Sequence, residues 1–147
     1  MTPVFLDANV QTYSAGRYHP MREPSRRILA LAADNPDAFV TDAEVLQELL
    51  HRYLALRHWP AGRDSIEEFT ALMAGRIEPM LAGDVERAAL LADHYPSLSA
   101  RDLVHASVMF RIGSSRIATA DRGFDLIDGI ERLDPMKVDE WRDTVST

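Results

Sequence analysis

The chain has 147 residues, of which 46% are hydrophobic and 27% charged, and its formal net charge at pH 7 is −7. This length and composition predict one soluble globular domain, residues 1–147, and the negative charge argues against a basic protein that coats nucleic acid. The absence of cysteine excludes disulfides and thiolate metal sites. Since no apolar run approaches ~18 residues and no basic leader opens the chain, we expect a cytoplasmic protein without a membrane span.

Short apolar runs alternate with amphipathic segments along the chain. We predict strands over these ranges: 4–6, 38–40, 77–81, 116–119 and 130–133. We predict helices over these ranges: 10–14, 24–33, 41–58, 64–73, 84–94, 100–112 and 124–128. The tail at 138–145 fits either a helix or an irregular segment. This alternation predicts an α/β fold in which helices cover both faces of a parallel sheet.

Three sequence signals mark where helices begin. Thr41 and Glu44 have the spacing of a capping box, so we expect a helix that starts at Thr41. A second box at 64–67 predicts another start, and Ser99 is expected to cap the helix at 100–112. Gly113 follows that helix as its terminator.

Four acids occupy positions that a sheet of this kind can bring together. Asp7 and Asp121 each follow a predicted strand, whereas Glu48 and Asp102 lie in early turns of predicted helices. Ligands bind beyond the carboxyl ends of strands in open α/β sheets, so all four can converge there. Three of the four acids have a plainer interpretation: Asp7 and Asp102 as acids that cap helix starts, and Glu48 as a surface residue.

Convergence of these carboxylates would demand a cation. Two carboxylates about 4 Å apart repel by roughly 4 kcal/mol at an effective dielectric of 20. A site built of oxygen ligands suits Mg²⁺ or Mn²⁺, and such ions activate water for phosphoryl displacement. Asp125, four residues after Asp121, can join them, and the Thr119 hydroxyl can orient a carboxylate. His105, one turn from Asp102, is expected to be a packing residue and not a ligand.

Four segments together resemble the PIN-domain family, and within it the VapC-type toxins of bacterial toxin–antitoxin pairs. They are Phe5-Leu6-Asp7-Ala8-Asn9, Thr41 through Leu49, Ser99 through Ala106, and Ile117 through Asp125. The segments have the family's order and spacing and span nearly the whole chain. The resemblance implies a PIN-like three-layer α/β/α sandwich with a central parallel sheet of about five strands, often in a homodimer.

The resemblance also implies an activity and a site. The expected protein is a Mg²⁺- or Mn²⁺-dependent endoribonuclease, the toxin partner of a VapB-type antitoxin, that hydrolyses RNA and leaves a 5′-phosphate. The family's acidic quartet corresponds to Asp7, Glu48, Asp102 and Asp121, its frequent fifth acid to Asp125, and its supporting polar positions to Asn9 and Thr119. We expect Asp7 and Asp102 to bind the ion directly. Ala8 departs from the Thr or Ser that is common there.

Basic segments offer a route for RNA to reach an acidic protein. We expect phosphate contacts from a first segment that contains Arg17, Arg22, Arg26 and Arg27. A second segment contains His51, Arg52, Arg57, His58 and Arg63. The plainer interpretation of both segments is a solvated helix face.

Two other classes of function compete with the nuclease. A non-catalytic PIN-like module would bind RNA or protein and keep the acids for stability or docking. An aspartate-based phosphotransfer protein fits less well. A haloacid-dehalogenase-like phosphatase needs a second acid where Asn9 stands, and a receiver domain needs a lysine at a late strand end, but Lys137 is in the tail.

Overall fold

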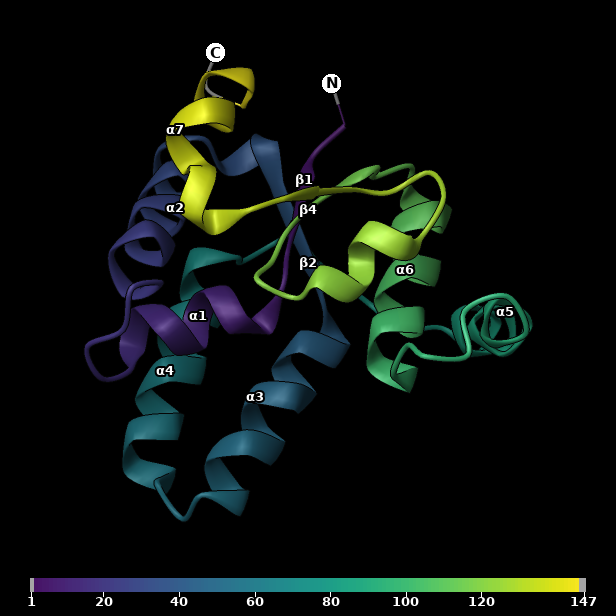
Figure 1. The fold of residues 1–147 in the computed structure, drawn as a ribbon. Helices are drawn as coiled ribbons and strands as arrows, with labels where there is room; N and C mark the ends of the chain where they lie inside the picture. The colour runs from purple at the N-terminus through teal and green to yellow at the C-terminus, as the bar shows by residue number, and fades with distance from the viewer. Residues whose placement is uncertain (1, 146–147) are drawn as a thin grey trace.

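A parallel five-stranded sheet runs through the centre of the computed structural model, which describes residues 2–145 (Figure 1). Its strands are β1 (Val4–Leu6), β2 (Phe39–Asp42), β3 (Ile77–Glu78), β4 (Arg116–Ala118) and β5 (Glu131–Leu133). Their order is β3-β2-β1-β4-β5, and every neighbouring pair is parallel. The first strand of the chain is therefore the middle strand of the sheet, and its three residues are fully buried.

Helices cover both faces of this sheet. They are α1 (Ala8–Ala15), α2 (Arg22–Asp34), α3 (Ala43–Ala55), α4 (Trp59–Leu72), α5 (Ala82–Ala92), α6 (Ala100–Ile112) and α7 (Val138–Trp141). Helices α1, α2 and α7 lie on one side and α5 and α6 on the other, while α3 and α4 extend together beyond the sheet edge (Figure 1). The predicted three-layer α/β/α architecture is confirmed.

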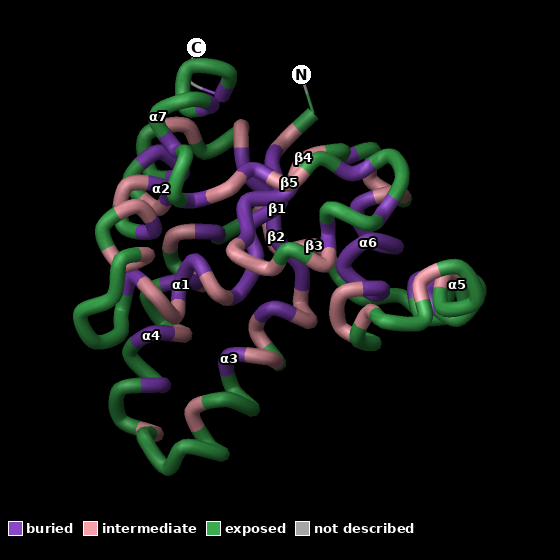
Figure 2. The backbone as a smooth tube through the Cα atoms, in the orientation of Figure 1, coloured by how far each residue is buried: buried purple, intermediate pink, exposed green. Residues whose placement is uncertain are grey.

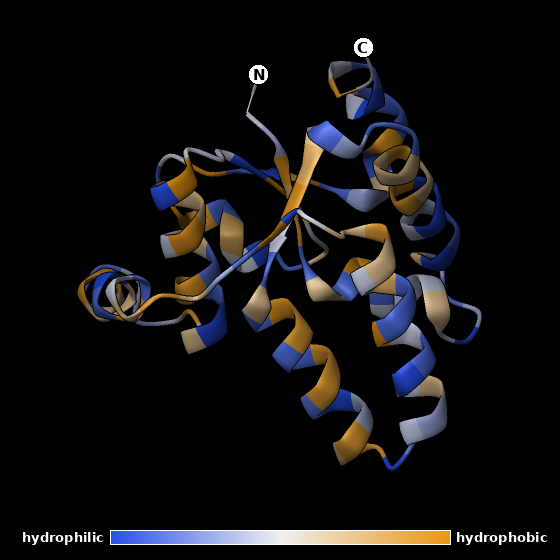
Figure 3. Cartoon of the chain, turned by 180° about the vertical axis from the view of Figure 1, so that it is seen from behind, coloured by the Kyte–Doolittle hydropathy of each residue, from blue (hydrophilic) through white to orange (hydrophobic). Residues whose placement is uncertain are grey.

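The hydrophobic core lies where the strands meet the inner faces of the helices. Its largest fully buried side chains include Phe5, Phe39, Phe69 and Phe124. Figure 2 shows the buried backbone concentrated in the strands and the exposed backbone in α5 and the outer turns of α3 and α4. Hydropathy follows the same division, with apolar residues along the strands (Figure 3). None of the helices within 2–145 has the length and apolar character needed to cross a bilayer.

The start of α3 differs from the prediction. Thr41 belongs to β2, and its hydroxyl donates a hydrogen bond to the Leu6 carbonyl at 2.9 Å. Asp42 is the true N-cap, because its carboxylate accepts a hydrogen bond from the Val45 N–H at 3.0 Å. The predicted box at Thr41 is therefore wrong by one residue, since Thr41 and Asp42 are both good caps.

The start of α4 was predicted too late in the chain. The helix begins at Trp59, with Pro60 in its first turn, not at the box that starts with Asp64. Proline after His58-Trp59 favours the end of one helix as readily as the beginning of the next, because its ring fits the first helical turn. Ser65 is instead buried in the helix, where its hydroxyl accepts a hydrogen bond from Gln11.

Candidate active site

The acidic residues gather beyond the carboxyl ends of β1, β2 and β4, where α1, α3 and α6 begin (Figure 1). Asp7 follows β1 and caps α1, and Asp121 follows β4 and caps the 3-10 helix Arg122–Leu126. Glu48 lies in the second turn of α3 and Asp102 in the first turn of α6. The topology thus brings all four predicted acids to the same edge of the sheet.

Hydrogen bonds from two segments, the start of α1 and the end of β4, hold the Asp7 carboxylate. Its Oδ1 accepts from the Ala8 N–H at 2.7 Å, and its Oδ2 accepts from the Thr119 hydroxyl at 2.7 Å. That hydroxyl oxygen accepts in turn from the Asn9 amide at 2.8 Å and from the Asp121 N–H at 3.0 Å. Asn9 and Thr119 therefore fix the orientation of Asp7 and tie together the ends of β1 and β4.

His105 on α6 is fully buried in the middle of the acids. Its Nδ1 lies 2.8 Å from Oδ2 of the buried Asp42. Its Nε2 faces Oδ1 of Asp7 at 3.8 Å and Oε2 of Glu48 at 3.9 Å, which are ionic contacts too long for hydrogen bonds. Within the described residues Nε2 has no hydrogen-bond partner, although it is buried.

These contacts define one cluster of ligand atoms. An oxygen each from Asp7 and Glu48 and a nitrogen of His105 all lie within 4.8 Å of one another. Arg101 closes the outer side of the cluster, with Nη1 at 3.9 Å from Glu48 and Nε at 3.6 Å from Glu44. Glu48 is the most exposed of the three, so it forms the side that faces solvent.

Asp102 and Asp121 form a second pair beside Asp7. The Ser99 hydroxyl accepts a hydrogen bond from the Asp102 N–H at 3.2 Å, which is the predicted cap. The Asp121 carboxyl is close enough to that of Asp102 to raise its pKa. A Cβ at Gly123 would lie 3.1 Å from the Asp121 carboxylate and 2.9 Å from the Leu98 side chain, so this turn fits closely around the pair because Gly123 has no side chain.

The electrostatics of the site follow from crowding of buried acids. Burial, the hydrogen bond to Asp121, and the charges of Asp121 and Asp7 raise the pKa of Asp102 to about 7. Burial also raises the pKa of Asp7, although the charge of His105 opposes the shift. Burial disfavours the charge of His105, but Asp42, Glu48 and Asp7 outweigh it and raise its pKa well above 6.5. Negative charge is therefore in excess here.

Asp125 lies outside this cluster of contacts. Its carboxylate receives two hydrogen bonds from Arg132 of β5, from Nε at 2.9 Å and Nη2 at 3.3 Å. Nη1 of Arg132 donates to the Thr119 carbonyl at 3.2 Å. The pair of Asp125 and Arg132 thus braces the chain next to Thr119.

The four arginines of the first basic segment occupy different surroundings. Arg17 is exposed at the end of α1, and Arg22 is half-buried. Nε of Arg26 donates to the Ser14 carbonyl at 3.0 Å, and Arg27 forms an ion pair with Asp139. Only Arg17 of the four lines a groove that also contains Asn9, which is hydrogen-bonded to Thr119 of the candidate site.

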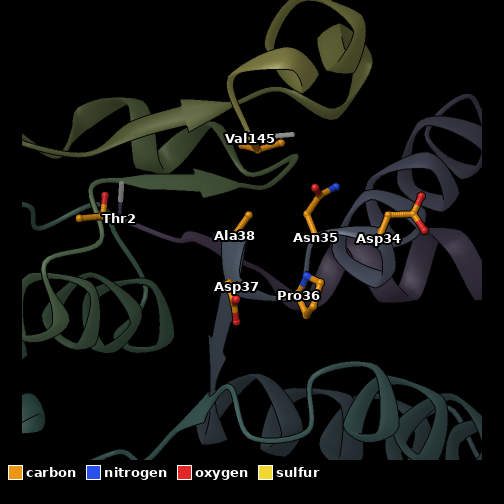
Figure 4. A pocket seen from close by; sticks show the side chains of 7 residues that line it. All are labelled: Thr2, Asp34, Asn35, Pro36, Asp37, Ala38 and Val145. Carbon is orange, nitrogen blue, oxygen red and sulfur yellow. The ribbon is translucent and has the colours of Figure 1, made fainter. Parts of the chain in front are cut away.

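A separate pocket of about 410 Å³ lies at the opposite edge of the sheet, because Thr2 precedes β1 and Ala38 precedes β2 (Figure 4). Its lining residues are Thr2, Asp34, Asn35, Pro36, Asp37, Ala38 and Val145. The parallel strands separate it from the acids, so it plays no part in the candidate site.

Sequence reasoning missed two residues of the site. Asp42 is not among the acids that the sequence analysis selects, and His105 is expected there to be a packing residue. They are 63 positions apart in the chain, and their pairing follows only from the alignment of β2 with α6. The local signal was an acid at a strand end, which Asp42 shares with Asp7.

Comparisons with known proteins agree with one another. Residues 4–130 match the model of the PIN domain family. Ribonuclease VapC23 of Mycobacterium tuberculosis is 40% identical over 121 residues, which are 80% of this chain and 92% of that protein. Ribonuclease VapC13 of the same organism is 36% identical over 130 residues, or 88% of this chain and 98% of that protein.

Solved structures share the same fold. A chain of the Rickettsia felis VapBC2 complex, bound to a promoter DNA fragment, superposes with a TM-score of 0.69 at 17% identity. The alignment covers 89% of this chain and 98% of that one. A chain of FitAcB from Neisseria gonorrhoeae gives a TM-score of 0.67 at 21% identity, covering 90% and 97%.

Proposed function

The chain belongs to the PIN-domain family, and from this premise we propose that it is a single-domain, metal-dependent endoribonuclease and the toxin of a VapBC-type pair. The observation that carries this proposal is the cluster of Asp7 and Glu48 around the buried nitrogen of His105, with Asp102 and Asp121 beside Asp7 at the same edge of the sheet. The relatives named ribonucleases support the activity.

The donor set fits a divalent cation. Carboxylate oxygens at this density repel one another unless they bind protons or a cation. The pKa values of Asp7 and Asp102 are raised first by burial and then by the charges of neighbouring carboxylates. Oxygen ligands suit Mg²⁺ or Mn²⁺. When bound, such an ion supplies activation of water and stabilisation of the charge that develops on the phosphodiester.

We assign direct contact with the ion to Asp7 and Asp102. Glu48, Asp121 and Asp125 would act through water or at a second ion, and Asp125 would first have to leave Arg132. Asn9 and Thr119 keep the Asp7 carboxylate in one orientation, so its geometry does not change as substrate arrives. Glu48, on the side open to solvent, is placed to accept a hydrogen bond from water.

We also propose an antitoxin partner and a homodimer. The structural neighbours are chains of toxin–antitoxin complexes, which supports a VapB-type partner. Large apolar side chains remain exposed on α3 and α5, among them Leu54 at 53% and Leu90 at 69%. Apolar surface of this kind favours protein contacts. An arginine of the antitoxin would complement the negative charge of the acids. A protein that cleaves cellular RNA would act in the cytoplasm.

One experiment tests the proposed activity. Purified protein should cleave RNA in Mn²⁺ or Mg²⁺, and EDTA should stop the reaction. Asp7→Asn should abolish cleavage and keep the fold, because the amide retains the size of the side chain but not its charge. Sequencing of RNA ends after brief expression of both proteins would locate the cut sites. Full activity of Asp7→Asn would reject the assignment, and a folded wild type that binds RNA without cutting would favour the binding module.

A further inference from the structure

A groove of about 490 Å³ lies between α1 and α3 and begins beside the acids. One wall is a face of α1 where Asn9 lies about one turn before Thr12 and Tyr13, and Gly16 follows at the C-cap of the helix. The opposite wall includes Arg52 and Tyr53 of α3. Because Asn9 is hydrogen-bonded to Thr119 and Asp7, one end of the groove opens directly at the candidate active site.

The charge of this groove is opposite to that of the whole chain. Its lining includes Arg17, His19, Arg52 and His58, and no Asp or Glu lines it within the described part of the chain. The protein carries a net charge of −7, so the positive charge of this groove differs from the negative charge of the chain as a whole. Arg52 also lines a smaller groove of about 300 Å³ that includes Glu48 and Arg101, so the basic surface continues to the acids.

Aromatic rings lie among these basic groups. The rings of Tyr13 and His19 are stacked, with centroids 4.7 Å apart and planes inclined by 30°. Nδ1 of His19 accepts a hydrogen bond from the Met21 N–H at 3.0 Å, which fixes the ring in this stack. The neighbouring Tyr18 is 87% exposed, so both the stack and a solvent-facing ring lie along the groove.

The position of Tyr53 in the groove wall is fixed by the packing of α3 on α4. A Cβ at Gly62 of α4 would lie 2.3 Å from Cβ of Tyr53, so the helices approach as closely as they do because Gly62 has no side chain. The Tyr53 hydroxyl lies 3.4 Å from the Ser65 hydroxyl and donates to it. Packed helices therefore form the α3 wall of the groove, whereas Arg17, Tyr18 and His19 lie in the segment between α1 and α2.

We propose that this groove binds the unpaired nucleotides of single-stranded RNA that adjoin the bond to be cleaved. In this assignment Arg17 and Arg52 contact phosphates, while Tyr18 and the ring pair of Tyr13 and His19 stack on bases. The assignment rests on the proposed ribonuclease function. Cationic and aromatic groups in alternation are characteristic of single-strand binding, because every base has a face that stacks. A duplex would not use these rings, since its bases are already stacked.

The test measures binding separately from cleavage. The background is Asp7→Asn, studied in EDTA by fluorescence anisotropy with a labelled single-stranded RNA of mixed sequence. Tyr18→Ala should weaken binding roughly five- to one-hundred-fold, whereas Tyr18→Phe should retain it because the ring is kept. Arg17→Ala and Arg52→Ala should each reduce the slope of log affinity against log salt by about 0.7.

Arg87→Ala is the matched control. Arg87 is exposed on α5, outside the groove lining, so its loss should leave both affinity and salt slope as in the background. Arg17, Tyr18, Arg52 and Arg87 are all exposed, and thermal melts of each variant verify the fold. Duplex RNA and poly-glutamate serve as competitors, and single-stranded RNA should bind more tightly than either.

Three results would overturn the assignment. Affinities of the groove variants equal to that of Arg87→Ala would exclude the groove from RNA binding. Displacement of RNA by poly-glutamate at equal charge, together with normal binding by Tyr18→Ala, would mark it as a site for an acidic peptide. Preference for duplex RNA would exclude stacking. Failure of the proposed function is distinct, because the wild type would then lack metal-dependent cleavage whatever the groove variants bind.

Discussion

At the scale of single residues, His105 is buried and surrounded by carboxylates, which raise its pKa well above 6.5 although burial opposes the shift. It pairs with Asp42, which is itself fully buried, and it faces Asp7 and Glu48. A buried charge without a partner is strongly unfavourable, so each member of this group depends on the others. His105 therefore joins the packing of α6 on β2 to the arrangement of the candidate active site.

Replacement of His105 should destabilise the fold. His105→Ala leaves the Asp42 carboxylate buried without its partner, and we expect the free energy of unfolding to fall by about 3–5 kcal/mol, measured by urea denaturation at pH 7. Addition of Asp42→Asn should restore part of the loss, since the unpaired charge is removed. A loss below about 1 kcal/mol would contradict the pairing.

The same pair predicts how stability changes in alkali. The pKa of His105 in the folded protein is raised well above 6.5, although burial opposes that shift, because Asp42, Glu48 and Asp7 surround the ring. The stabilisation is therefore complete below pH 6.5 and is lost only as pH rises through the folded-state pKa. His105→Ala should lack this alkaline loss.

Asp102 predicts a loss of stability of the same sign as pH rises, but over the acidic range. Its pKa is raised from 3.8 to about 7, so the folded protein retains a proton that the unfolded chain releases. Stability contributed by this group is complete below pH 3.8 and is lost as pH rises to about 7. In EDTA, Asp102→Asn should thus be more stable than the wild type at pH 8, with little difference near pH 4.

The expected size of the Asp102 effect is modest. Asp102 is partly exposed, and after allowance for solvent screening we expect roughly 1 kcal/mol, or about 3–5 °C in Tm. Thermal denaturation of both proteins between pH 4 and 8 measures it. A variant less stable than the wild type at pH 8 would mean that the metal-free site does not carry excess negative charge.

At the scale of elements, local signals placed most strands and helix caps. Apolar runs located β1, β2 and β4, and Ser99 and Gly113 located the ends of α6. Local signals failed where two neighbouring residues offer the same chemistry. Thr41 and Asp42 both can cap a helix, and the choice is made by the hydrogen bond from Thr41 to β1, which no local pattern encodes.

The contact between α3 and α4 rests on one glycine, which makes a sharp test. A Cβ at Gly62 would overlap Tyr53, so Gly62→Ala should force the helices apart and destabilise the protein by about 1–3 kcal/mol. Gly83→Ala in α5 is the control, because nothing lies within 4 Å of its Cβ position. That change should be neutral or stabilising by up to about 1 kcal/mol. Urea denaturation of both variants compares them, and equal effects would refute close packing at Gly62.

At the scale of the whole molecule, the sheet order explains how distant acids meet. β1 lies between β2 and β4, so the residues that follow these strands share one edge although they are far apart in sequence. The sequence predicted this convergence because parallel strands present their carboxyl ends together. It could not predict that His105 fills the space between Asp7 and Glu48, or that Arg132 engages Asp125, because both contacts depend on side-chain packing between elements.

Excess negative charge at this edge couples folding to a divalent ion. An ion that binds only the folded protein stabilises it by about 2.7 kcal/mol at a concentration 100 times its Kd. We expect Mn²⁺ or Mg²⁺ to raise Tm more at pH 8 than at pH 5.5, because the pKa of Asp102 is about 7 and protons compete for its carboxylate at low pH. Differential scanning calorimetry in each ion, with NaCl at matched ionic strength, measures the shift.

Two variants decide whether the ion acts at the predicted acids. Asp7→Asn should lose most of the stabilisation, because it removes one of the proposed ligands. Asp125→Asn should keep most of it, since the Asp125 carboxylate is engaged by Arg132 and not by the cluster around Asp7. Equal stabilisation of Asp7→Asn and the wild type, or an effect independent of pH, would place ion binding elsewhere on the molecule. The difference between the ion-dependent rises in Tm of Asp7→Asn and Asp125→Asn therefore tests directly whether the acids gathered by the sheet bind the metal.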